Sequence, residues 1–223
     1  MKKTYSALAL LLALCLLLSA CGERRREAEE NVIDDKYRNW YEVFVYSYFD
    51  SDGDRIGDLG GLAEKLDYIS GLGMNGIWLM PVMPSPSYHK YDVTDYYDID
   101  PQYGTLEDFS ALLEKAHALG IDVIIDLVLN HTSNEHPWFL SARSGEDSEY
   151  RNWYNWSDSP QDGYAKAGEA YYECRFVNTM PDLNLDNPEV RAEIENILRF
   201  WLEDVGVDGF RLDAVTSYYT GSA

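Results

Sequence analysis

Short runs of β-branched and aromatic residues alternate with amphipathic segments along most of the chain. Four runs have the length and composition of strands: 42–49, 75–82, 122–130 and 208–215. Three segments between them have helical periodicity and end at a glycine: 62–73, 105–120 and 187–206. This alternation predicts a parallel sheet whose strands are joined by right-handed crossovers.

Two of the predicted helices have clear start signals. Thr105 followed by Asp108 is typical of a capping box, and apolar residues spaced for one buried face come after it: Phe109, Leu112, Leu113 and Ala116. Asn187 followed by Pro188 places a capping residue before a proline at the first helical position. The second and third helices are therefore predicted to begin at these residues.

The strand and helix pattern fits two architectures, a doubly wound open sheet and a TIM barrel. Polar residues lie near the C-terminal ends of the third and fourth predicted strands: Asn130, His131, Arg211 and Asp213. Both architectures keep their functional site at the carboxyl ends of parallel strands. The pattern alone therefore leaves both architectures open.

Residues 132–179 interrupt the repeat between the third strand and its helix. A structureless loop of this length is uncommon inside a compact domain, so a small inserted domain is predicted. The segment is rich in tryptophan and tyrosine: Trp138, Trp153, Tyr154, Trp156, Tyr164, Tyr171 and Tyr172. Aromatic faces can stack on sugar rings, but the simpler interpretation is that most of these side chains form the core of the inserted domain.

The N-terminus has the pattern of an export signal. Lys2 and Lys3 precede an apolar run at 7–18 that is too short to span a membrane, which indicates a secretory signal over residues 1–20. The run ends in LSAC at 18–21, which resembles the bacterial lipobox and predicts lipidation of Cys21. The mature protein is then expected outside the cytoplasm, anchored to the bacterial membrane. An internal membrane-core helix is the alternative interpretation.

The composition is that of an acidic globular protein. Apolar residues make up 46% of the 223 positions, and the formal net charge of -21 argues against nucleic-acid binding, which needs Lys and Arg at the phosphates. Residues 21–36 are charged and almost free of apolar side chains, as a linker would be, so folded structure is expected from about Tyr37. If Cys15 is removed and Cys21 is lipidated, Cys174 has no partner, and no disulfide framework is expected.

Candidate chemistry lies at the ends of the third and fourth predicted strands. Arg211 and Asp213 share one face of an extended strand, and a carboxylate beside a permanent cation stays ionised at neutral pH. Such a pair serves either a nucleophile or a structural ion pair. Asp126 is expected to reach Arg211 from the neighbouring strand, and His131, just past the strand end, is placed to donate to a bound hydroxyl group.

The stretch DSDGDRIGD at 50–58 places carboxylates at alternate positions of a glycine-containing loop, which hard cations prefer. It is not an EF-hand, because Arg55 stands at the sixth position and Gly61 at the twelfth. The interpretation is a calcium loop, and an acidic, solvated turn is the alternative. The expected ligands are Asp50, Asp52, Asp54 and Asp58, with the carbonyl of Ile56 as a further one.

Five ordered stretches resemble the α-amylase family of glycoside hydrolases, over nearly everything from Tyr41 onward. They are DSDGDRIGDLGG, GIWLMPV with YHKYDVTDYYDIDPQYGT, DLVLNH, MPDLN and GFRLDAV. The resemblance implies a (β/α)8 TIM barrel of which only the first half, strands 1–4, is present, formed by residues 37–131 and 180–223 with residues 132–179 inserted after strand 3. The MPDLN stretch is closest to neopullulanase-like and intermediate members.

The resemblance also implies roles for single residues. Asp213 matches the nucleophile and Arg211 the arginine that orients it, while Tyr91 and His131, with His89 close by, match the subsite that holds the sugar to be cleaved. Asn130 and Asp182 match positions that bind calcium in many members. Three positions depart from common patterns: Thr216 and Ser217 replace a lysine and a histidine, and Lys90 stands where glycine is common.

The implied function is a retaining α-glucan hydrolase that cleaves mainly α-1,4 bonds of starch, maltodextrin or related oligosaccharides. The family's acid glutamate follows strand five and a further aspartate follows strand seven. The chain is therefore expected to be the N-terminal part of a longer enzyme, without the general acid. The alternatives are a non-catalytic glucan-binding lipoprotein and a transglycosylase of the same family.

Overall fold

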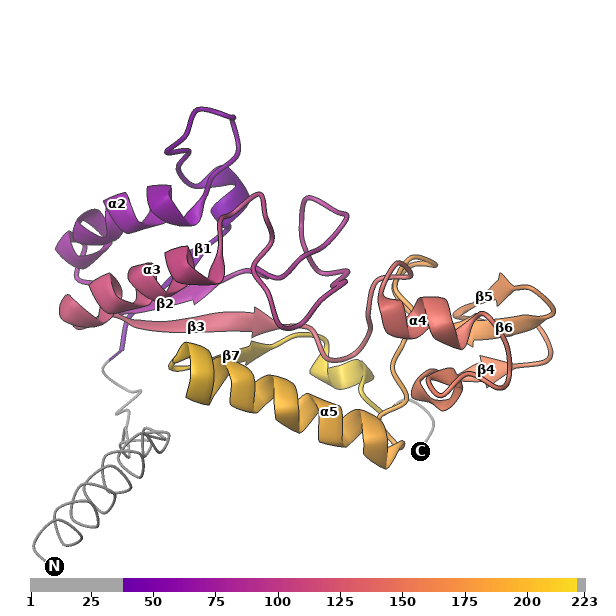
Figure 1. Cartoon of the computed structure of the whole chain (residues 1–223). Helices are drawn as coiled ribbons and strands as arrows, with labels where there is room; N and C mark the ends of the chain where they lie inside the picture. The colour runs from indigo at the N-terminus through magenta and orange to yellow at the C-terminus, as the bar shows by residue number, and fades with distance from the viewer. Residues whose placement is uncertain (1–37, 220–223) are drawn as a thin grey trace, which may run out of the picture. The chain divides into compact units, whose positions relative to one another are not determined.

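The computed structural model describes residues 38–219, and its centre is a four-stranded parallel sheet of order β1-β2-β3-β7 (Figure 1). The strands are β1 (Trp40–Val43), β2 (Gly76–Leu79), β3 (Asp122–Leu127) and β7 (Gly209–Leu212). Each neighbouring pair is parallel. The predicted parallel α/β sheet is therefore confirmed.

The crossovers are α2 (Leu59–Gly71), α3 (Leu106–Ala118) and α5 (Pro188–Arg199), which continues into the π-helical turn η4 (Phe200–Val205). The predicted capping box is present, because Thr105 accepts from the Asp108 amide while the Asp108 carboxylate accepts from the Thr105 amide. Asn187 caps α5 through the Glu189 amide. The predicted starts of α3 and α5 are confirmed.

Several predicted boundaries were wrong, and two of them have a clear structural cause. Helix α2 begins at Leu59, earlier than the predicted residue 62, because Asp58 caps it by accepting from the Gly61 amide. The first strand ends at Val43, and a 3-10 turn, η2 (Val45–Ser47), follows it. Residues 44–49 leave the sheet because two of their carbonyls accept hydrogen bonds from the acidic loop, residues 50–58. The Gly57 amide donates to the Tyr46 carbonyl, and the Asp58 amide donates to the Phe49 carbonyl.

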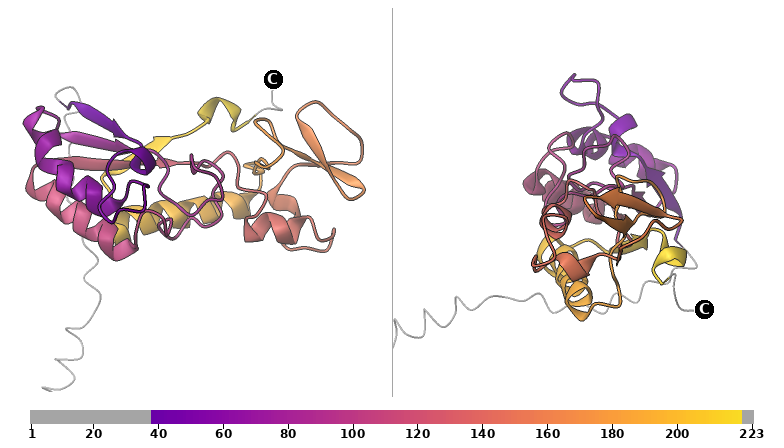
Figure 2. Two further views of the ribbon diagram at one scale, coloured as in Figure 1. Left: turned by 90° about the horizontal axis from the view of Figure 1, so that it is seen from above. Right: turned by 90° about the vertical axis from the view of Figure 1, so that its right-hand side faces the viewer.

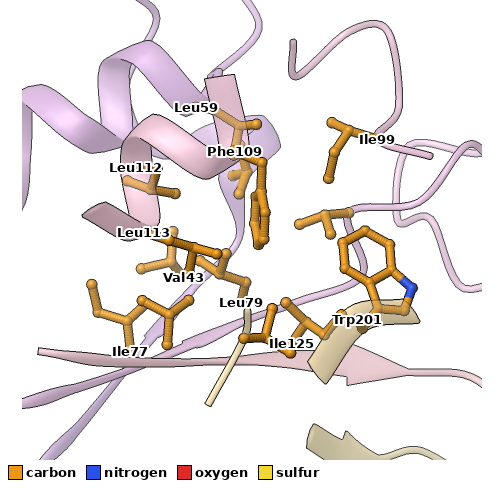
Figure 3. Packing of buried hydrophobic residues seen from close by; sticks show 14 of the residues in the cluster. Val43, Leu59, Ile77, Leu79, Ile99, Phe109, Leu112, Leu113, Ile125 and Trp201 are labelled. Atoms are coloured by element: carbon orange, nitrogen blue, oxygen red, sulfur yellow. The ribbon is translucent and has the colours of Figure 1, made fainter. Parts of the chain in front are cut away.

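The main hydrophobic core lies between the sheet and its helices. The left view of Figure 2 shows α2, α3 and α5 on one side of the four strands. In Figure 3, Phe109, Leu112 and Leu113 of α3 pack over Ile77 and Ile125 of the sheet. Burial of each such side chain contributes about 1.5–3 kcal/mol. The alternate residues of the same strands point to the other face, and they include Trp78, Asp126 and Arg211.

The segment between β3 and α5 forms its own small sheet and core. Strands β4 (Trp156–Ser157), β5 (Tyr164–Ala167) and β6 (Ala170–Glu173) pair antiparallel in the order β4-β6-β5, after the short helices α4 (Pro137–Ala142) and η3 (Arg151–Trp153). Its buried cluster includes Phe139, Tyr154 and Tyr172. Trp138, Trp153 and Trp156 pack against this cluster, so packing accounts for several of the aromatic residues. The domain boundaries at 132 and 179 stay a prediction.

The predicted signal, Cys21 and the charged linker lie outside the described residues. Within 38–219, none of the helices combines the length and apolar character that a membrane crossing would need.

Candidate active site

Arg211 connects two carboxylates at the carboxyl ends of β3 and β7. Its Nη1 atom is 3.1 Å from Oδ1 and 3.2 Å from Oδ2 of Asp126, which lies opposite it in the pairing of β7 with β3. The same Nη1 atom is 2.5 Å from Oδ1 of Asp213. The structure thus brings together the three residues that the shared strand faces predict.

Asp126 is the buried member of this group. Its side chain has 0% exposure and accepts a hydrogen bond from the Tyr91 hydroxyl at 3.0 Å as well as from Arg211. Burial raises the pKa of Asp126 to about 6, although Arg211 and Tyr91 both favour its ionised form. Burial, followed by the charge of Asp126, raises the pKa of the Tyr91 hydroxyl far above its usual range. Tyr91 and Asp126 therefore form a neutral donor and a buried acceptor behind Arg211.

Asp213 stands at the point where the chain leaves the sheet. Its amide donates to the Leu127 carbonyl at 3.1 Å, which holds the residue beside the end of β3. The next residue, Ala214, has φ +51°, a left-handed conformation that is unfavourable for alanine and turns the chain into η5 (Val215–Ser217). The Asp213 side chain is 17% exposed. Asp213 is therefore the accessible carboxylate of the group. Its backbone lies between a hydrogen bond to β3 and the left-handed turn at Ala214.

His89, Tyr91 and His131 lie close together beside these carboxylates. The Nδ1 atom of His89 accepts from the Tyr91 amide at 3.2 Å. His131 is buried and its Nε2 atom donates to the Tyr91 carbonyl at 3.2 Å. Burial lowers the pKa of His131, so it is neutral near pH 7. The sequence predicts that His131 donates to a bound hydroxyl group, but in this structure its Nε2 atom donates to the Tyr91 carbonyl.

Asn130 and Asp182 face each other under the same strand end. The Asn130 amide donates to Asp182 Oδ1 at 3.1 Å, and Asp182 pairs with His131 in an isolated bridge. Burial raises the pKa of Asp182 to about 7. A buried carboxyl and an amide oxygen are suitable donors for a hard cation, which would stabilise the ionised form of Asp182.

The acidic loop brings three of its four predicted carboxylates together. Asp50, Asp52 and Asp58 each offer an oxygen within 4.8 Å of the others, which suits a hard cation. Asp54 is outside this group, and its Oδ1 atom accepts from the Ile56 amide at 2.7 Å. Asp50 accepts from the Gly53 and Arg55 amides, and these hydrogen bonds lower its pKa. The role of Asp54 as a fourth ligand stays a prediction.

Trp78 belongs to the site but was not singled out from the sequence. The Arg211 guanidinium lies 5.1 Å from the centre of its ring. Within the described part of the chain, the buried Trp78 Nε1 atom has no hydrogen-bond partner. The period-two alternation of β2, which puts Trp78 on the face of Asp126 and Arg211, was a signal that could have found it.

A parallel α/β sheet with an arginine and two carboxylates at its carboxyl strand ends has the arrangement of a barrel-type enzyme site. The chain belongs to the alpha-amylase family, because residues 42–222 match the alpha amylase catalytic domain.

Three similar proteins show the range of that family. Alpha-amylase 3 of Dictyoglomus thermophilum is 55% identical over 189 residues, which cover 82% of this chain and 38% of the relative. Trehalose synthase/amylase TreS of Mycolicibacterium smegmatis is 45% identical over 198 residues, with 81% and 33% covered. The solved structure of Eubacterium rectale Amy13B has a TM-score of 0.80 and 58% identity, covering 83% of this chain and 38% of that one. The chain thus spans about a third to two fifths of the length of these relatives.

Proposed function

We propose that the full-length protein is a retaining α-glucan hydrolase that acts mainly on the α-1,4 bonds of starch, maltodextrin or related oligosaccharides. The observation that carries the proposal is the shared guanidinium, since Arg211 contacts both the buried Asp126 and the accessible Asp213. Membership of the alpha-amylase family supports the same chemistry.

In this proposal Asp213 is the nucleophile. Its carboxylate oxygen attacks the anomeric carbon, and the bond from that carbon to the leaving oxygen breaks, which gives a covalent glycosyl-enzyme. Water then cleaves this intermediate. Arg211 orients the attacking carboxylate, because its Nη1 atom lies 2.5 Å from Oδ1 of Asp213. Tyr91, His89 and His131 line the position of the sugar ring.

The leaving oxygen needs a proton from a second carboxylic acid, about 5–5.5 Å from the nucleophile in retaining enzymes. Asp126 cannot serve, because it is fully buried and its oxygens are engaged with Arg211 and Tyr91. We assign this role to a carboxylate outside residues 38–219.

Calcium has a structural role in this proposal. Asp50, Asp52 and Asp58 would hold one ion in the acidic loop, with Asp54 and Ile56 adjacent to it. Asn130 and Asp182 would contribute to a second site behind His131. Bound calcium would neutralise these carboxylates and stabilise the loops, and it takes no part in bond cleavage.

The alternatives are a transglycosylase and a non-catalytic glucan-binding lipoprotein. The first is favoured by one observation, a relative that bears both the names trehalose synthase and amylase. An acceptor sugar added to the reaction would separate transfer from hydrolysis. We further propose that Cys21 is lipidated and that the protein is anchored to the membrane outside the cytoplasm; palmitate labelling of the wild type, lost in Cys21→Ala, tests this.

The test of the proposed function is the Asp213→Asn substitution in the full-length protein. Maltodextrin hydrolysis should fall at least about 10³-fold, because an amide cannot form the glycosyl ester. The matched control is Asp67→Asn, which removes a carboxylate that is 75% exposed on α2. Activity near the wild-type level in Asp213→Asn would remove the assignment.

A further inference from the structure

Lys90 has an environment that is unusual for a lysine. It lies between His89 and Tyr91, yet its side chain is only 2% exposed. Its backbone has φ +63°, in the left-handed region that favours glycine. Lysine is therefore unfavourable here on two counts: a strained backbone, and an ammonium group removed from water.

The ammonium group of Lys90 has three polar partners within the fold. Its Nζ atom is 2.8 Å from Asp100 Oδ2 and donates to Gln102 Oε1 at 2.6 Å and to the Ser85 carbonyl at 3.4 Å. It also lies 5.5 Å from the centre of the Tyr103 ring. The ion pair with Asp100 compensates the buried charge and fixes the lysine stem at its far end.

Asp100 is in turn fixed to the main body of the fold. Its amide donates to the Val82 carbonyl, just beyond β2, and its carboxylate accepts from the amides of Ser85 and Gln102. The anchor of Lys90 is thus tied to the end of the central sheet. A strained residue persists only where its surroundings determine its conformation in this way.

The groups on either side of Lys90 face the candidate active site. The Tyr91 hydroxyl donates to Asp126, the Tyr91 carbonyl accepts from His131, and the Tyr91 amide donates to His89. All three contacts depend on the direction of the chain at position 90. A change of φ there would rotate the Tyr91 peptide away from both histidines.

We propose that Lys90 is a positioning residue, whose ammonium group, fixed on Asp100 and Gln102, holds the left-handed turn that directs His89 and Tyr91 to the site of Asp126 and Arg211. It does not touch the substrate. The effect on catalysis rests on the proposed function, but the effect on the two histidines does not.

The test compares three variants of the full-length protein. Lys90→Gly removes the anchor and permits any φ, whereas Lys90→Met keeps the stem but leaves Asp100 unpaired. The double variant Lys90→Met with Asp100→Asn removes both charges, so it should fold even if Lys90→Met alone is unstable. Lys166→Met, at an exposed position of β5, is the matched control.

The first measurement is the side-chain nitrogen NMR spectrum of the histidines, of which the chain has four. In Lys90→Gly and in the double variant, the His89 and His131 resonances should move, while those of His117 and His136 stay. Lys166→Met should leave all four unchanged. Unmoved His89 and His131 resonances would overturn the proposal, whether or not the protein cleaves glucans.

The second measurement separates positioning from stability. At a temperature well below unfolding, kcat/KM for maltodextrin should fall by about 10²-fold in Lys90→Gly and in the double variant, because misplacement of catalytic groups by about 1 Å has that effect. Most of the fall should be in kcat. Variants that unfold at a lower temperature but keep the wild-type kcat/KM would show a merely structural lysine and overturn the proposal. A wild type that does not cleave maltodextrin would refute the proposed function, and the histidine resonances would still decide the role of Lys90.

Discussion

Arg211 lies directly opposite Asp126 in the pairing of β7 with β3, and its Nη1 atom is within 3.2 Å of both carboxylate oxygens. The same atom contacts Oδ1 of Asp213. The Arg211 guanidinium is therefore held by the buried Asp126 and orients the accessible Asp213. The position of Asp213 therefore depends on Asp126 of the neighbouring strand β3, through Arg211. Substitution of Asp126 or of Arg211 should affect the activity that depends on Asp213.

Replacing Arg211 by lysine should lower kcat/KM for maltodextrin by about 10²-fold in the full-length protein. An ammonium group is a point charge and cannot orient both carboxylates as the planar guanidinium does. Steady-state kinetics measures this effect. Arg199→Lys, on the exposed end of α5, is the control and should keep the wild-type value. An active Arg211→Lys enzyme would show that the geometry of the arginine is not needed.

Replacing Arg211 by methionine should reduce the free energy of unfolding by about 3 kcal/mol, because it leaves Asp126 buried without its cation. The figure is the lower end for such pairs, since Arg211 is itself 36% exposed. Urea unfolding measures it. Adding Asp126→Asn should recover part of the loss, because no buried charge then remains. A double variant no more stable than the single one would contradict this account.

Asp126 should make a pH-dependent contribution to stability. Burial raises its pKa from 3.8 to about 6 in the folded protein, so the folded state binds its proton more tightly than the unfolded state does. The stability from this proton is fully present below pH 3.8 and is lost as the pH rises to about 6. The free energy of unfolding of the wild type, minus that of Asp126→Asn, should therefore fall over this window and be constant above it. A difference that rises with pH would be the wrong sign.

Calcium should raise the unfolding temperature through the acidic loop. An ion that binds only the folded state adds about 2.7 kcal/mol at a concentration 100 times its Kd. Scanning calorimetry with calcium and with a chelator measures the shift. Asp52→Asn should reduce it, because Asp52 is one of the three grouped carboxylates, whereas Asp162→Asn, on the exposed turn before β5, should not. An equal shift in both variants would place the ion elsewhere.

The sequence predicted the sheet and its helices because the signals there are local. The capping box at Thr105 and the proline after Asn187 set helix starts whatever lies nearby. Alternation along β3 and β7 placed Asp126 and Arg211 on one face, and parallel pairing then brought them together. The end of the first strand was not predictable in this way, because it depends on contacts of Tyr46 and Phe49 with a loop later in the chain.

Details of the site that depend on long-range contacts were also beyond the sequence. The engagement of His131 with the Tyr91 carbonyl joins residues 40 positions apart. The grouping of Asp50 and Asp52 with Asp58, without Asp54, depends on how the loop folds, which alternate spacing does not reveal. Lys90 was visible only as a departure from glycine, and its buried partner Asp100 is known only from the fold.

The identity of the nucleophile is tested most directly by trapping the glycosyl-enzyme. The full-length protein would be incubated with a fluorinated glucosyl fluoride, digested, and analysed by peptide mass spectrometry. The account predicts one labelled peptide, with the sugar ester-linked to Asp213, and no label in Asp213→Asn. A label on any other side chain, with Asp213 unmodified, would contradict it.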